Sequence, residues 1–145
     1  MKISDNTIGI LRNFSDINAN ILFKPGKTLS TMSTMKNIMA QADVEEEFES
    51  EFGVYDLPEF LRAIDSFQQP VLKFNGTANL KIQDEKSTLS ARYAFADKST
   101  LRYPSKQISM PDKTVTFSLK NSDYESVKKL YTCLLYTSDA ADDSL

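Results

Sequence analysis

The sequence predicts an α+β fold, and three observations lead to that class. Two segments carry apolar residues at helical spacing behind a capping residue. Several other segments alternate apolar and polar residues, as half-buried strands do. Turn pairs such as Pro25-Gly26 and Asn75-Gly76 separate the strand segments. With 41% hydrophobic and 26% charged residues, a chain of 145 residues can bury a core.

The first predicted helix covers about residues 6–18, after a short edge strand at residues 1–4. Asp5 or Asn6 is the candidate N-cap. The spacing predicts an apolar face formed by Ile10, Leu11, Phe14 and Ile17. The opposite face carries Asp5, Gly9, Arg12, Asn13 and Asp16.

The second predicted helix covers about residues 57–67. Asp56 is its candidate N-cap, and Pro58 falls in the first turn, where a missing N–H costs nothing. Its apolar stripe is predicted to be Leu57, Phe60, Leu61, Ile64 and Phe67. Its polar stripe is Glu59, Arg62, Asp65 and Ser66.

Strands are predicted between and after these helices. They lie at residues 21–23, 28–32 and 38–44, through Phe48, Phe52 and Val54, and at residues 71–74, 80–82 and 89–95. Residues 97–113 lack periodicity and form a candidate linker. A further strand at 115–119 and a helix containing Tyr124, Val127, Leu130 and Tyr131 follow, with Asn121 or Ser122 as the cap. This late strand, cap and helix repeat the plan of the first residues at a period of about 115 residues, which indicates either duplicated domains or coincidence.

The order and spacing of several motifs resemble a known family. These are Met1-Lys2-Ile3-Ser4, Leu11-Arg12-Asn13-Phe14, Val54-Tyr55-Asp56-Leu57 and Ala78-Asn79-Leu80-Lys81-Ile82. Together they resemble the trimeric DNA polymerase sliding clamps of large tailed phages, from residue 1 to about 131. The resemblance implies a DNA clamp fold, with two helices per domain lining a central hole and antiparallel sheets outside. It also implies one complete domain at residues 1–110 and the beginning of a second at 111–132.

Residues 133–145 do not continue the clamp pattern. They contain Asp139, Asp142 and Asp143 and no basic residue. They look like translated sequencing adapter, and the alternative is a genuine acidic terminus. We favour a non-native tail on a clamp cut short in its second domain, and therefore expect this chain not to close a ring.

The composition argues against catalysis. The chain has no histidine, one cysteine and isolated glycines, so we expect no enzyme activity, no cofactor and no metal. The acidic run at Glu45-Glu46-Glu47 is either a divalent-ion site or a solvated strand face, and we favour the latter because Phe48 and Phe52 alternate with the carboxylates that follow. No segment approaches the length of a membrane span.

The resemblance implies a processivity factor that encircles double-stranded DNA in the cytoplasm of an infected bacterium. Its implied partners are DNA polymerase, a clamp loader and two further copies in a homotrimer. The net charge of −3 means that DNA contacts must come from local basic residues. The candidate DNA-facing residues are Arg12, Arg62, Lys128 and Lys129. The alternative function is a non-catalytic phage structural or adaptor domain.

Overall fold

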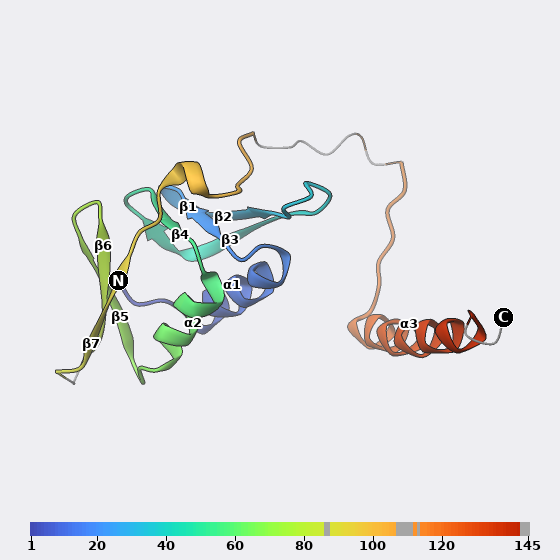
Figure 1. The fold of residues 1–145 in the computed structure, drawn as a ribbon. Coiled ribbons are helices and arrows are strands. Elements are labelled where there is room, and N and C mark those ends of the chain that lie inside the picture. Colours follow the sequence, from blue (N-terminus) through green and yellow to red (C-terminus); the bar gives the residue numbers. More distant parts are fainter. Residues whose placement is uncertain (86–87, 107–111, 113, 143–145) are drawn as a thin grey trace. The chain divides into compact units, whose positions relative to one another are not determined.

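The computed structural model describes residues 1–85, 88–106, 112 and 114–142. The chain divides into two compact units, Met1–Gln107 and Ile108–Leu145. The first unit contains two helices, seven strands and a short 3-10 helix among its described residues, and the second contains one long helix (Figure 1). The predicted α+β class is confirmed.

Helix α1 (Asp5–Ile17) begins one residue before the predicted start. Its N-cap is Ser4, not Asp5 or Asn6, because Ser4 has extended backbone and its hydroxyl accepts a hydrogen bond from Thr7 N at 3.3 Å. The expected apolar face is partly corrected. Ile10 and Ile17 are half-buried, whereas the buried residues are Thr7, Ile8, Leu11 and Phe14.

Helix α2 (Leu57–Asp65) has the predicted N-cap. The carboxylate of Asp56 accepts a hydrogen bond from Glu59 N at 2.8 Å. The predicted stripe is also confirmed, since Leu57, Phe60, Leu61 and Ile64 are all buried. Phe67 is buried as well, although the helix ends before it.

Two antiparallel strand pairs form one side of the core. Strand β1 (Ile21–Phe23) pairs with β4 (Phe52–Val54), and β2 (Gly26–Met32) pairs with β3 (Met39–Phe48). The strand predicted to run through Phe48 and Phe52 is therefore divided between β3 and β4. The even spacing of these residues gave no sign of the break, because both phenylalanines are buried on either side of it.

A three-stranded antiparallel sheet forms the other side. It consists of β5 (Pro70–Asn75), β6 (Asn79–Asp84) and β7 (Ser90–Ala94) in that order. The predicted hairpin turns at Gly76, whose φ of 66° is in the region that favours glycine. The expected edge strand at the N-terminus appears as one bridge from Lys2 to Val71. Leu89 was predicted to be on the buried side of the last strand, but it precedes the strand and is 60% exposed.

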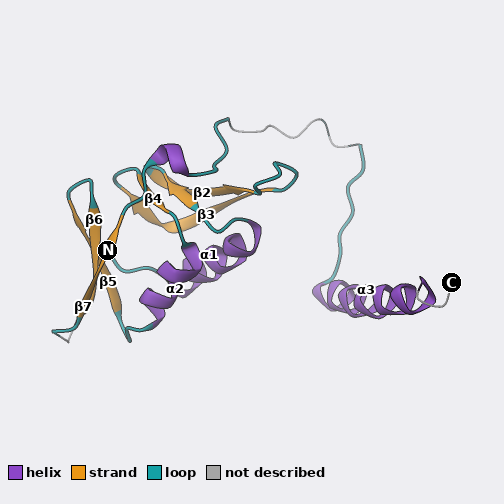
Figure 2. Ribbon diagram, in the orientation of Figure 1, coloured by secondary structure: helices purple, strands orange, loops and turns teal. Residues whose placement is uncertain are grey.

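Five phenylalanines join the two sides of the core. Phe52 is central: it stacks on Phe23 at 4.4 Å between ring centroids and contacts Phe74 and Phe95 at 5.2 and 5.0 Å. Phe48 lies 5.0 Å from Phe23. The short β1–β4 pair is thus held between the β2–β3 hairpin and the β5–β7 sheet (Figure 2).

The first half of the expected linker packs against the first unit. Ala96 pairs with Gly53, and Leu101 is buried over the same glycine, where an added Cβ would meet Leu101 Cδ1 at 2.5 Å. Asn18 Nδ2 donates to the carbonyl of Arg102 at 3.0 Å. These contacts anchor residues 96–104, which lack periodicity because they form a 3-10 turn (Lys98–Thr100) and irregular backbone.

The second unit lacks the expected strand at residues 115–119, which are irregular. Helix α3 (Asn121–Asp142) is continuous and extends through the described part of the predicted tail. Its large apolar side chains up to residue 134 are exposed: Tyr124, Val127, Leu130, Tyr131 and Leu134. None of the described helices combines the length and apolar character needed to cross a bilayer.

Candidate nucleic-acid interface

Helices α1 and α2 lie side by side and are joined by a surface ion pair (Figure 1). Arg12 Nη2 of α1 is 2.8 Å from both carboxylate oxygens of Asp65 in α2. The two side chains are 57% and 47% exposed, so this pair contributes at most about 1 kcal/mol to stability. Arg12 is therefore on the surface, as predicted, but its charge is already paired.

Arg62 is exposed one helical turn before Asp65 and has no ion pair among the described residues. Of the four candidate DNA-facing residues, Arg12 and Arg62 are on two adjacent helices of the first unit. Four carboxylates are also exposed on the same two helices: Asp5, Asp16, Glu59 and Asp65. The helix pair thus presents more acidic than basic groups to solvent.

Lys128 and Lys129 are exposed on α3 in the second unit. The Nζ of Lys128 is 3.3 Å from Glu125 Oε1 and 5.2 Å from the ring centre of Tyr124. Lys129 has no ion pair among the residues that the structure describes. The charge of Lys128 is thus partly compensated within its own helix, whereas Arg12 is paired with a residue of the neighbouring helix.

The acidic run has a structural member. Glu46 of β3 accepts hydrogen bonds from the backbone N of Ser4 and from the hydroxyl of Thr7. In a capping box, a helix residue three positions after the N-cap supplies this acceptor. Here Thr7 occupies that position, and the carboxylate comes from a distant strand. Partial burial raises the pKa of Glu46, but the hydrogen bonds from Thr7 and Ser4 outweigh it and leave the pKa below its ordinary value of 4.5.

The neighbours of Glu46 point away from the helix. Glu45 and Glu47 are exposed on β3, as is Asp43. No group of three possible metal ligands occurs among the described residues. The run is therefore a solvated strand face with one inward carboxylate that holds the start of α1.

A basic row on the three-stranded sheet was missed from the sequence. Lys73 of β5 is opposite Lys81 of β6, and Lys81 is opposite Arg92 of β7. The alternation of apolar and polar residues within each predicted strand is enough to place each of these basic residues on the polar face of its own strand. Their alignment, however, depends on the register between strands, which no local pattern specifies.

The fold defines the class of protein: a mixed α+β domain in which two adjacent helices and antiparallel sheets share one core. Comparison with known proteins identifies the relatives. The chain is 32% identical over 131 residues to the sliding clamp of Escherichia phage RB69, covering 90% of this chain and 57% of the relative.

Two further relatives agree. The sliding clamp of Vibrio phage KVP40 is 34% identical over 132 residues, which are 89% of this chain and 59% of that protein. The sliding clamp of Enterobacteria phage T4 is 28% identical over 131 residues, which are 90% and 57% of the two chains. No protein-family model matches. The chain is therefore a relative of the phage sliding clamps, as its motifs predicted, and it spans less than two-thirds of their length.

Proposed function

We propose that this chain acts as part of a sliding clamp: a non-catalytic ring that encircles duplex DNA and tethers the replicative polymerase as a processivity factor. The observation that carries this proposal is the similarity to three phage sliding clamps along nine-tenths of the chain. The adjacent helices α1 and α2, packed with antiparallel sheets in one core, fit that role. A ring holds DNA by topology, so it needs no tight binding site.

The proposed partners follow from the same role. They are double-stranded DNA read without sequence preference, DNA polymerase, a clamp loader and two further copies in a homotrimer. The site of action is the cytoplasm of the infected bacterium. In domain terms, residues 1–110 form the N-terminal clamp domain, residues 111–132 begin a second, and residues 133–145 are non-native.

The proposed DNA contacts are Arg12, Arg62, Lys128 and Lys129, each directed at phosphates. Strong phosphate binding would slow sliding, and base contacts would halt it. The ion pair of Arg12 with Asp65 supports a weak contact, because a phosphate has to compete with a carboxylate held at 2.8 Å. The carboxylates around the helices weaken the attraction further.

A chimera tests the proposal. The matching stretch of the phage RB69 sliding clamp is replaced by residues 1–131 of this chain, and the product is loaded on closed circular DNA. A clamp should stay on the circle at salt concentrations that abolish simple binding, and should be lost when the circle is cut. Equal loss from circular and linear DNA would instead favour the alternative, a phage structural or adaptor domain.

Substitution of Arg12 tests the proposed contact. In the chimera, Arg12→Ala should weaken DNA association equally on all sequences and reduce the salt dependence by about one unit of log–log slope per contact. The free energy of unfolding should change by no more than about 1 kcal/mol, because the ion pair is exposed. Lys27→Ala, at an exposed strand position, is the matched control. Unchanged retention of Arg12→Ala at low salt would remove Arg12 from the DNA-facing surface.

A further inference from the structure

The basic row on the β5–β7 sheet is an unusual arrangement of charge. In the pairing register, Lys73 faces Lys81 and Lys81 faces Arg92 across adjacent strands. Neighbouring strands lie about 4.8 Å apart, so three positive charges form a line across the sheet. Like charges directly opposite each other destabilise a sheet. Folding alone therefore does not explain the row.

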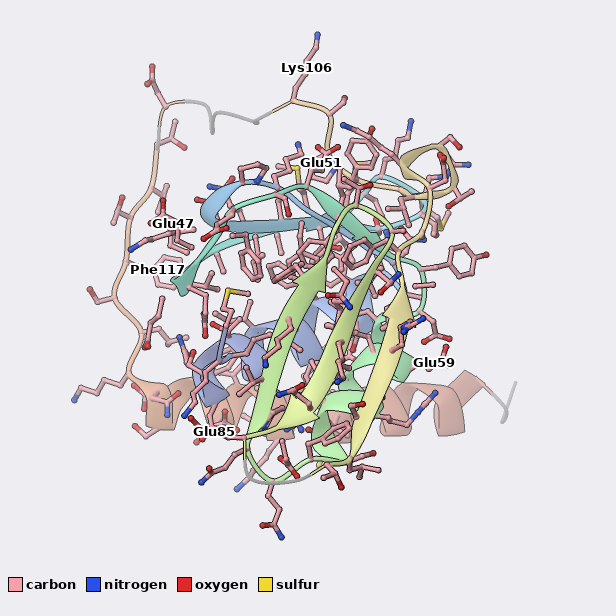
Figure 3. The ribbon with its side chains drawn as sticks, turned by 90° about the vertical axis from the view of Figure 1, so that its left-hand side faces the viewer. Glu47, Glu51, Glu59, Glu85, Lys106 and Phe117 are labelled. Carbon is pink, nitrogen blue, oxygen red and sulfur yellow. The ribbon has the colours of Figure 1, made fainter. Side chains whose placement is uncertain are left out.

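The row is on the solvent side of the sheet. Each basic residue has a neighbour in sequence that packs into the core: Leu72 beside Lys73, Leu80 beside Lys81 and Tyr93 beside Arg92. The ring of Tyr93 contacts Phe60 of α2 at 5.0 Å between centroids. Because side chains alternate along a strand, the three basic side chains point to the opposite side of the sheet. Figure 3 views this sheet with α1 and α2 behind it.

The other strand positions of this face include no acidic residue, and four of the six are polar. Within the three strands, the other positions on this side are Val71, Asn75, Asn79, Gln83, Ser90 and Ala94. None of the three bases has an ion pair with another described residue. Among the described residues, three carboxylates are near this face. Glu85 follows the end of β6 and is paired with Lys2 at 2.7 Å, and Glu47 and Glu49 share a groove of about 620 Å³ with Lys73.

We propose that the outer face of the β5–β7 sheet binds the phosphate backbone of duplex nucleic acid through Lys73, Lys81 and Arg92. The surrounding amides and hydroxyl belong to the residue types that contact phosphates alongside Lys and Arg. The surface is separate from the helices, to which the clamp function assigns its DNA contacts. It would hold a duplex that is outside the clamp.

The residue types on this face favour duplex nucleic acid over two other anionic ligands, single-stranded nucleic acid and an acidic peptide. A platform for single strands uses exposed aromatic rings on which bases stack, and the aromatic residues of these strands face the core instead. An acidic peptide docks most firmly where an apolar anchor enters a pocket. Val71 and Ala94 are the apolar residues among the strand positions of this face, and they are at different edges. Duplex phosphates need neither feature.

The test measures binding of the full chain to a linear duplex of about 20 base pairs by fluorescence anisotropy across a salt series. A short linear duplex reports direct contact, whereas retention on circular DNA reports the clamp function, so the two proposals fail separately. The main variant is K73Q/K81Q/R92Q. The control K27Q/K36Q/K106Q removes three exposed lysines from elsewhere in the first unit.

The sheet variant should lose duplex binding, with the slope of log K against log salt reduced by about 3, because each phosphate contact contributes about 0.9. The control should retain most of the slope. K81R should bind like the parent chain and K81Q should not, which decides the question even if the triple variant folds poorly. Equal binding by the sheet variant and the parent would overturn the proposal. So would tighter binding of single-stranded DNA or of a poly-glutamate peptide than of the duplex.

Discussion

The two compact units both contain helices with apolar residues at helical spacing, but they differ in how far these apolar side chains are buried. In the first unit, Leu11 of α1 and Phe60 of α2 are fully buried within one continuous core. In the second, Leu130 of α3 is 61% exposed, and its apolar neighbours on that helix are exposed as well. The difference shows that an amphipathic pattern specifies a face and leaves the identity of its partner open.

The first unit is stable because its core elements interlock. The rings of Phe23, Phe52 and Phe95 connect β1, β4 and the segment after β7. Residues distant in sequence thus cover each other, and the stabilisation comes mainly from apolar burial. The described apolar side chains of α3 up to residue 134 are exposed, and a helix without packing of its apolar face has only marginal stability in water.

The largest expected effect is at the centre of this core. Phe52→Ala should destabilise the first unit by about 3–5 kcal/mol, because it removes a buried ring and leaves a cavity between the two sides of the core. Chemical denaturation followed by circular dichroism measures the change. Tyr55→Ala, at a 62% exposed aromatic residue nearby in sequence, should change stability by no more than about 0.5 kcal/mol. Similar losses in the two variants would contradict the packing described for Phe52.

An intermediate effect is expected at the start of α1. Glu46→Gln should cost about 1–2 kcal/mol near neutral pH, since the carboxylate accepts two hydrogen bonds but is only partly buried. The folded pKa of Glu46 is lowered, so its contribution is present above the ordinary value of 4.5 and is lost as pH falls through the folded pKa. Melting curves of the variant and parent should therefore converge as the pH falls below about 4.5. Glu47→Gln, at the exposed neighbour, is the control and should melt like the parent near neutral pH. A difference for Glu46→Gln that stays constant with pH would refute the assigned role.

The smallest effect is expected in the second unit. Leu130→Ala should change the free energy of unfolding by no more than about 0.5 kcal/mol, because the side chain is already exposed to water. Chemical denaturation followed by circular dichroism measures the change. The matched substitution Leu61→Ala in α2 should cost about 2–5 kcal/mol, since Leu61 is 5% exposed in the core. If the two leucines proved equally costly, the contrast between the units would be wrong.

Much of the fold was predictable from local signals. The stripe of α2 and its Asp56 cap follow from helical spacing and hydrogen-bond chemistry within four or five residues. The hairpin at Gly76 follows from the backbone freedom of glycine. Other features could not be predicted from local patterns, because contacts with distant segments determine them. The N-cap at Ser4 is supported by Glu46 of β3, and residues 96–104 are ordered by contact with Gly53 and Asn18.

The sequence by itself determined the α+β class, the buried stripe of α2, the similarity to phage sliding clamps and the exposure of Arg12 and Arg62, because each depends on residue order and short-range periodicity. The tertiary structure decided which charges meet. Arg12 is paired with Asp65 because α1 and α2 are adjacent, and Lys73, Lys81 and Arg92 form one row because the strand register aligns them. Coulomb interactions act across space between segments far apart in the chain, and only the folded arrangement fixes those distances.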